Sequence, residues 1–293
     1  MTWSAGLRRR LKLNISLSKY TTFKVGGRAR FFFEPKNTRE LISILKESHK
    51  LRLACYVIGN GSNLLVSDKG LDAAVIRLSN PYFQRIDFKK NRAEAGSGLT
   101  VRHLLEKAKN QGLGGLEFLA GIPGTVGGAL VMNAGIKTDS IGSLIKEVKV
   151  IDSNNEIRIL KGSRLRFAYR KSNLAKYIIL SAKFKLIKKS RQQIDQSIRD
   201  FLKKRWEAQD VSAFSAGCVF KNPISDSAGR LIDLCGLKGK RIGDAQISGR
   251  HANFIINRGR AKAEDILKLI GFVKDRVKEK FGINLEEEIK IWQ

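Results

Sequence analysis

Residues 115–135 read GLEFLAGIPGTVGGALVMNAG, a small, apolar and glycine-dense stretch. Within it, Gly121, Gly124 and Gly127 recur at every third residue, and Gly128 follows directly. A backbone without Cβ atoms can approach a flat ligand or a pyrophosphate very closely. The alternative is a tightly packed loop between a strand and a helix. The spacing therefore predicts either a cofactor loop or a close-packed turn.

A second glycine loop, GNGSN at residues 59–63, follows a short apolar strand predicted at residues 55–58. Its backbone N–H groups can converge on an anion, and its Ser and Asn side chains add donors. A plain turn is the competing interpretation, because Asn and Gly favour turns. The loop is neither a Rossmann fingerprint nor a P-loop, since a third glycine opening a helix and a Gly-Lys-Ser/Thr sequence are both missing. Together, the two loops indicate a large phosphorylated cofactor.

Around these loops, helix and strand patterns follow one another in mixed order, with the strands segregated. This order predicts an α+β fold and not a doubly wound sheet. A chain of 293 residues suits two or three domains of about 100–200 residues each, and a boundary is predicted near residue 188. A helix capped at residues 37–38 and carrying Leu41, Ile44 and Leu45 is predicted. Further helices are predicted at residues 101–111, 189–206, 228–235 and 264–281, and strands at residues 22–25, 30–34, 55–58, 64–66, 148–152, 157–160, 177–187, 251–257 and 285–292.

The composition limits the classes of protein. Hydrophobic residues make up 42% of the chain, enough for a core, yet no window approaches the roughly 18 apolar residues of a membrane span. The basic N-terminal segment has no apolar block after its arginines, so no signal peptide is expected and the cytosol is the predicted compartment. The formal charge of +29 favours an anionic partner. The alternative is a compositional bias of the source organism, because the cations are scattered along the chain and do not form one block.

The stretch SAGCVFKNP, residues 215–223, places a thiol between a flexible Ala-Gly pair and a run that ends in proline. Cys55, Cys218 and Cys235 are the three cysteines, an odd number without metal-ligand spacing. A disulfide framework or a zinc site is therefore not expected, and no metal is predicted. At Cys218 the residue pattern leaves three options open: a buried filler, a nucleophile or an acid.

Three further positions carry side chains suited to chemistry. Arg170, in FAYRKS, can clamp a carboxylate with two hydrogen bonds, although a surface arginine is the commoner case. Glu286 and Glu288 share one side if residues 285–292 form a strand. His251 opens an apolar strand, and the pattern leaves its role open.

These pieces together resemble the UDP-N-acetylenolpyruvoylglucosamine reductases, the flavoenzymes of peptidoglycan precursor synthesis. The resemblance covers residues 14–292. It implies an FAD-binding unit of the vanillyl-alcohol-oxidase type in two subdomains, residues 1–75 and 76–188, and an α+β substrate-binding domain, residues 189–293. The motifs that carry it are, in order, LSKYTTFKVGGRA, VIGNGSNLLVSD, GLEFLAGIPGTVGGALVMNAG, YRKS, SAGCVFKNP, AGRLIDLCGLKG, HANFIIN and LEEEIKI.

The resemblance also implies the reaction and its ligands. NADPH reduces a non-covalent FAD, and the flavin passes hydride to the enolpyruvyl ether of a UDP-sugar, which gives UDP-N-acetylmuramate. It further implies a cytoplasmic enzyme, which we expect to be a monomer without a specific nucleic-acid partner or a membrane anchor. The alternatives are an FAD-dependent oxidoreductase of the same fold with another substrate, and a basic nucleic-acid-binding protein. The latter is disfavoured because no recognition helix is apparent and the aromatic residues are not interleaved with the basic runs.

By position in these motifs, Arg170 matches the arginine that binds the developing enediolate, and Glu288 matches the catalytic glutamate. Cys218 matches the proton donor, which in much of the family is a serine. The segment 205–214 departs from the family pattern, which leaves its nucleotide contacts in doubt, and the chain resembles the subclass without a lid insertion. The implied FAD contacts are Gly59, Asn60, Gly61, Ser62, Asn63, Gly121, Pro123, Gly124, Thr125, Gly127, Gly128 and Asn133, and the implied substrate contacts are Tyr169, Asn222 and His251.

Overall fold

The computed structural model describes residues 3–210 and 212–293. Residues 1 and 2 of the basic N-terminal segment, and Val211 within the stretch 205–214, lie outside it. By their internal contacts the elements group into two units, each built from separate parts of the chain. The predicted three-part division at residues 75 and 188 stays a prediction. Among the described residues, unit 1 comprises residues 3–13, Phe31–Gly59 and Ala73–Lys204, and unit 2 comprises Asn14–Arg30, Asn60–Asp72 and residues 205–210 and 212–293.

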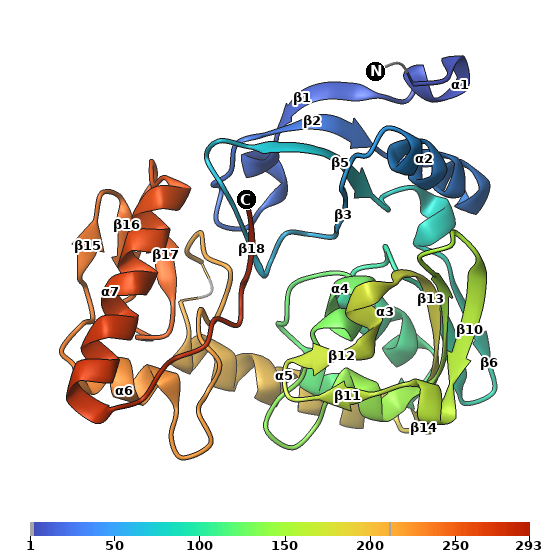
Figure 1. Cartoon of the computed structure of the whole chain (residues 1–293). Coiled ribbons are helices and arrows are strands. Elements are labelled where there is room, and N and C mark those ends of the chain that lie inside the picture. Colours follow the sequence, from blue (N-terminus) through green and yellow to red (C-terminus); the bar gives the residue numbers. More distant parts are fainter. Residues whose placement is uncertain (1–2, 211) are drawn as a thin grey trace. The chain divides into compact units, whose positions relative to one another are not determined.

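Four strands of the N-terminal part form a sheet in the order β1-β2-β5-β3 (Figure 1). Helix α2 follows β2 and begins after Asn37, which caps it. The Oδ1 of Asn37 accepts a 3.0 Å hydrogen bond from the N–H of Glu40. Leu41, Ile44 and Leu45 form its buried face, as their spacing predicts. The bounds are Ala5–Arg8 for α1, Lys12–Ser16 for β1, Arg28–Phe33 for β2, Thr38–Lys50 for α2, Cys55–Ile58 for β3, Leu64–Val66 for β4 and Leu71–Arg77 for β5.

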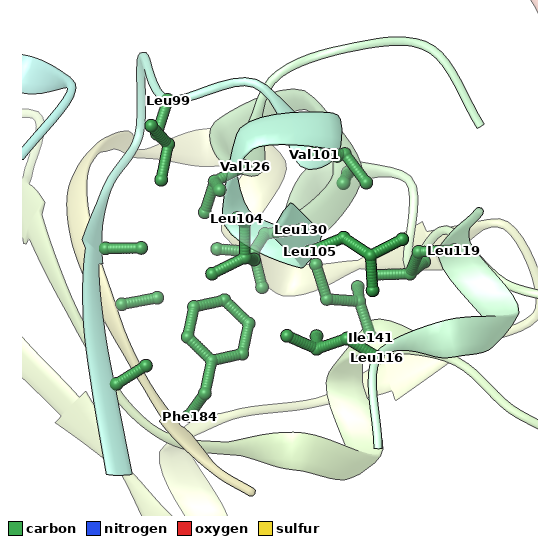
Figure 2. Packing of buried hydrophobic residues seen from close by; sticks show 14 of the residues in the cluster. Leu99, Val101, Leu104, Leu105, Leu116, Leu119, Val126, Leu130, Ile141 and Phe184 are labelled. Atoms are coloured by element: carbon green, nitrogen blue, oxygen red, sulfur yellow. The ribbon is translucent and has the colours of Figure 1, made fainter. Parts of the chain in front are cut away.

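A five-stranded antiparallel sheet, in the order β10-β9-β13-β7-β6, forms the centre of unit 1. Helices α3 and α4 pack apolar side chains against it, and Figure 2 shows Leu104 of α3, Leu130 of α4 and Phe184 of β13 in one core. The bounds are Ile86–Lys89 for β6, Arg92–Gly96 for β7, Val101–Asn110 for α3, Leu113–Gly114 for β8, Val126–Val131 for α4, Ile145–Ile151 for β9, Ile157–Lys161 for β10, Phe167–Ala168 for β11, Lys171–Ser172 for β12, Ile178–Lys185 for β13, Ile187–Lys188 for β14 and Arg191–Ala208 for α5.

Unit 2 contains the three-stranded antiparallel sheet β15-β16-β17 and a parallel pair of β18 with β4. Its longest helix, α7, begins where the carboxylate of Asp68 accepts hydrogen bonds from the N–H groups of Ala263 (2.9 Å) and Glu264 (3.0 Å). It ends at Gly282, whose φ of +69° is left-handed. The bounds are Ala228–Leu234 for α6, Arg241–Ile242 for β15, Ala245–Ile247 for β16, Ile255–Asn257 for β17, Ala263–Phe281 for α7 and Lys290–Trp292 for β18.

These separate, mostly antiparallel sheets with helices beside them confirm the predicted α+β fold. The strand predicted at residues 22–25 is wrong. Lys24 has φ +58°, and the hydroxyl of Thr21 donates a 2.8 Å hydrogen bond to the carbonyl of Val25, which closes a turn. The strand predicted from residue 251 begins only at Ile255, because the N–H of Phe254 turns back to the carbonyl of His251.

Candidate active site

Cys218 lies in an extended segment of unit 2, directly after a glycine. Gly217 has φ +76°, a left-handed conformation that favours glycine, which explains the small residue before the thiol. Cys218 pairs with Phe254 in an isolated antiparallel bridge, and the N–H of Val219 donates a 2.8 Å hydrogen bond to the carbonyl of Asn253. The half-buried thiol therefore sits on a backbone that is held along this edge.

Glu288 lies along the opposite edge of the same segment. Its N–H donates a 2.7 Å hydrogen bond to the carbonyl of Val219, and Phe220 pairs with Glu287 in an antiparallel bridge. The side-chain amide of Asn63 donates a 3.2 Å hydrogen bond to the carbonyl of Glu288. Unit 2 thus brings together the end of the first glycine loop, the cysteine segment and the C-terminal glutamates, three regions that are remote in sequence.

The two carboxylates before Glu288 have lysine partners. The Nζ atom of Lys221 lies 2.9 Å from a carboxylate oxygen of Glu286, and that of Lys274 lies 2.9 Å from one of Glu287. Burial acts to raise the pKa of Glu287, but the hydrogen bond and the charge of Lys274 outweigh it, so the net pKa is lowered. Each of the two carboxylates therefore forms an ion pair with a lysine.

Asn222 and His251 both adjoin the start of helix α6. The Oδ1 of Asn222 accepts a 3.0 Å hydrogen bond from the N–H of Ala228, and a Cβ added at Gly229 would lie 3.2 Å from Cε1 of His251. The Nδ1 of His251 accepts a 3.2 Å hydrogen bond from the N–H of Asn253. Burial lowers the pKa of His251, which favours the neutral ring, and the bond that Nδ1 accepts places the hydrogen of that ring on Nε2.

Arg170 lies in unit 1, in the two-residue turn that joins β11 to β12. Its φ of +52° is uncommon for a residue with a side chain, and such strained residues gather at functional sites. The guanidinium Nη1 donates a 3.1 Å hydrogen bond to the carbonyl of Gly135, and the guanidinium carbon lies 5.2 Å from the ring centre of Tyr169. The Tyr169 side chain is half exposed.

Asn133 holds this turn from inside unit 1. Its buried side chain donates a 3.0 Å hydrogen bond to the carbonyl of Ala168 and accepts one of 3.0 Å from the N–H of Gly142. The two bonds occupy both ends of the amide, and they support the hairpin that carries Arg170. The assignment of Asn133 to FAD stays a prediction.

The second glycine loop meets the first at Gly59. A Cβ added at Gly59 would lie 2.6 Å from the Oγ1 of Thr125, the residue that caps α4. Gly127 packs closely, because its N–H donates a 2.9 Å hydrogen bond to the carbonyl of Ser97 and an added Cβ would lie 3.1 Å from the Cβ of Ser97. At Gly128, an added Cβ would meet only Thr125, at 3.6 Å, among the described residues. The loop is thus close-packed on one side and leaves space beside Gly128.

The rest of the first loop belongs to unit 2. Gly61 has φ +59°, and an added Cβ would lie 2.1 Å from the carbonyl of Tyr20, so only glycine fits. Its own carbonyl accepts a 3.2 Å hydrogen bond from the N–H of Thr22. The remaining predicted FAD residues lie in the same two loops: Asn60 and Ser62 in the first, and Gly121, Pro123 and Gly124 in the second.

Asn253 is a site residue that the sequence analysis missed. It is 2% exposed and contacts the cysteine segment through both its backbone and its side chain. The available signal was its position inside an apolar run, HANFIIN, because a polar side chain buried in such a run needs hydrogen-bond partners.

Unit 2 contains a cavity of about 300 Å³. It is bordered by part of the segment that departs from the family pattern, and no predicted site residue lines it. The cavity lining consists of Asp210, Ser212, Ala213, Phe214, Ile256, Asn257, Arg258 and Gly259.

Among the helices of the described residues, none is both long and apolar enough to cross a bilayer.

Two family models match the chain. The model described as "UDP-N-acetylenolpyruvoylglucosamine reductase, C-terminal domain" matches residues 209–292, and the model described as "FAD binding domain" matches residues 29–161. The second match covers the first glycine loop, residues 59–63, and the second, residues 121–128.

Proteins named UDP-N-acetylenolpyruvoylglucosamine reductase resemble the chain over nearly its whole length. The protein from Caldicellulosiruptor bescii is 46% identical over 94% of this chain and 88% of its own. The protein from Prochlorococcus marinus is 41% identical over 96% of this chain and 97% of its own. The crystal structure of UDP-N-acetylenolpyruvylglucosamine reductase from Thermus caldophilus superposes with a TM-score of 0.84 at 38% identity, covering 97% of this chain and 99% of that one.

Proposed function

Because this chain belongs to the UDP-N-acetylenolpyruvoylglucosamine reductase family, we propose that it reduces the enolpyruvyl ether of UDP-N-acetylglucosamine-enolpyruvate to UDP-N-acetylmuramate. The family predicted from the sequence is confirmed, and with it the FAD-binding unit, FAD and NADPH as cofactor and co-substrate, and a place in peptidoglycan precursor synthesis. The roles of individual residues are our proposal.

The residues of the two glycine loops fit FAD. Within unit 1, Gly59 packs closely against Thr125 of the second loop, and the space beside Gly128 allows a ligand to approach the backbone. When bound and reduced by NADPH, FAD would supply a hydride to the terminal vinyl carbon of the substrate. The residues of these loops hold and orient the cofactor.

Arg170 binds the substrate carboxylate in this proposal. Hydride addition places negative charge on the carbon beside that carboxylate, and a guanidinium placed where charge develops lowers the barrier. The hydrogen bond to Gly135 supports the role because it orients the guanidinium, and the positive φ of Arg170 is of the kind that gathers at functional sites.

Cys218 supplies the proton that completes the product. The carbon next to the carboxylate gains a proton while the vinyl carbon gains the hydride, so the double bond becomes the saturated lactyl ether. A thiol with an ordinary pKa of about 8.5 is protonated at neutral pH and releases its proton readily. We propose that Glu288 carries or shares a proton in this step, because a second charged carboxylate would repel the developing dianion.

The substrate's remaining groups fit the start of α6. The Nε2–H of a neutral His251 is a donor suited to a diphosphate oxygen, and Asn222 lies beside the same helix start. We propose both as substrate contacts.

The observation that carries the catalytic proposal is the 2.7 Å hydrogen bond from Glu288 to Val219, which places Glu288 beside the segment of Cys218. The test is the purified protein with the enolpyruvyl sugar nucleotide. It should carry FAD, bleach with NADPH, regain its colour when the substrate is added, and yield the lactyl ether by mass spectrometry. Bleaching without recovery would favour a flavin enzyme with another substrate, and a protein that takes up no FAD would exclude both.

A further inference from the structure

Asn253 bonds to both backbone polar groups of one residue, Phe220, with the two ends of its carboxamide. Its Oδ1 accepts a 2.9 Å hydrogen bond from the N–H of Phe220, and its Nδ2 donates one of 2.8 Å to the carbonyl of Phe220. Its own carbonyl accepts the N–H of Val219 at 2.8 Å. A single buried residue therefore makes three hydrogen bonds to the two residues that follow Cys218.

This clamp takes the place of a missing strand partner. The backbone of residues 253 and 254 pairs with the cysteine segment only at the isolated bridge of Cys218 with Phe254 and the bond of Val219 to Asn253, and the buried N–H and C=O of Phe220 need partners as well. The side chain of Asn253 provides them at Phe220. The opposite edge of the segment holds Glu288 through the carbonyl of Val219.

The same residue also orients His251. The N–H of Asn253 donates to Nδ1 of His251, which keeps the hydrogen of the neutral ring on Nε2. The proposed proton donor and a proposed substrate contact thus share one anchor.

We propose that Asn253 is the positioning residue that sets the placement of Cys218 relative to Glu288. This inference rests on the proposed function, because the roles of Cys218 and Glu288 belong to the proposed step in which the substrate receives its proton. A displacement of about 1 Å in a catalytic group can slow a reaction by roughly 100-fold. Loss of the clamp therefore slows the step that consumes substrate and leaves the reduction of the flavin by NADPH intact.

The test compares Asn253→Leu with Asn257→Leu as a matched control. Asn257 is also buried, accepts hydrogen bonds from the N–H groups of Gly259 and Ala261 and donates one to the carbonyl of Phe23, and we assign it no catalytic role. Stopped-flow absorbance separates flavin reduction by NADPH from reoxidation by the enolpyruvyl substrate. Mass spectrometry measures the rate at which iodoacetamide alkylates Cys218.

In Asn253→Leu, we expect reoxidation by substrate to slow by roughly 10- to 100-fold, with reduction by NADPH within about twofold of the original protein. The alkylation rate of Cys218 should change by at least about threefold, because the backbone beside the thiol is released. Asn257→Leu should leave both rates near those of the original protein, even where it lowers the unfolding temperature as much.

Asn253→Asp provides a second test. A protonated carboxyl can donate to the carbonyl of Phe220 and accept from its N–H, as the amide does, whereas an ionised one can only accept. Reoxidation in this variant should therefore be near normal at low pH and should fall as pH rises, beginning at a lower pH than in the original protein. This series decides the matter if Asn253→Leu does not fold.

Normal reoxidation and normal Cys218 alkylation in Asn253→Leu, or a pH profile of Asn253→Asp identical to the original, would overturn this inference and leave the proposed function standing. Failure of the unaltered protein to be reoxidised by the enolpyruvyl substrate would instead overturn the proposed function.

Discussion

Glu288 and Val219 are joined by a 2.7 Å hydrogen bond between their backbones, which fixes the C-terminal glutamate beside the segment that begins at Cys218. Backbone bonds of this kind place side chains more firmly than contacts between flexible side chains do. This pairing joins the segments that carry Cys218 and Glu288.

Replacement of Cys218 should separate the two half-reactions. Cys218→Ser keeps an O–H that can donate a proton, so we expect it to retain much of the activity. Cys218→Ala should still allow NADPH to bleach the flavin, while reoxidation by substrate slows by roughly 10²- to 10⁴-fold, the usual contribution of a general acid. Stopped-flow absorbance measures both steps. Normal turnover of Cys218→Ala would remove the thiol from the mechanism.

Glu288→Gln should impair the same half-reaction, by roughly 10²- to 10⁴-fold, because the amide cannot supply a proton. The control is Glu286→Gln, whose side chain is 77% exposed and pairs with Lys221. An exposed ion pair contributes only about 0–1 kcal/mol, so this control should turn over normally. Equal losses in the two variants would argue for a general charge effect instead of a specific role for Glu288.

Gly59→Ala should weaken FAD binding. The new Cβ would lie 2.6 Å from the Oγ1 of Thr125, and relief of such a contact typically costs about 1–3 kcal/mol and shifts the backbone. The FAD content of the purified protein and its affinity for added FAD measure the effect. Gly6→Ala is the control, because no described atom lies within 4 Å of its added Cβ. Full FAD content in Gly59→Ala would show that the loop tolerates displacement.

Asp68→Ala should destabilise the fold without affecting chemistry. The carboxylate caps α7 through the N–H groups of Ala263 and Glu264, and loss of such a cap typically costs about 0.5–2 kcal/mol. Urea unfolding measures the change. Asp72→Ala, which removes an exposed ion pair with Arg30, should cost less than about 1 kcal/mol. A smaller loss for Asp68→Ala than for Asp72→Ala would contradict the cap.

His251 should make stability depend on pH. Its pKa is lowered in the fold by burial, whereas in the unfolded chain the ring titrates near an ordinary value of about 6.5. As pH falls below that value, the unfolded chain binds a proton that the folded protein does not, so stability decreases. The unfolding free energy should drop more between about pH 7.5 and 5.5 in the original protein than in His251→Gln. Parallel slopes in the two proteins would contradict this origin.

Several features could be predicted from residue pattern alone. Helix α2 follows from the Asn37 cap and the apolar spacing after it, and strand β13 from the long apolar run before residue 188. The glycines at 59–63 and 121–128 marked the two loops, since positive φ and close approach are local demands that only glycine meets. Eight ordered motifs were enough to indicate the family, and with it FAD.

Tertiary structure decided which remote residues meet. Residues 22–25 have strand composition, yet Thr21 and Lys24 turn the chain, because tertiary partners at Gly61 outweigh local propensity. No local pattern could indicate that Asn253 bonds to Phe220, or that Glu288 lies beside Val219. Those contacts join residues far apart in the chain, and hydrogen bonds between them form only once the surrounding core has brought the backbones together.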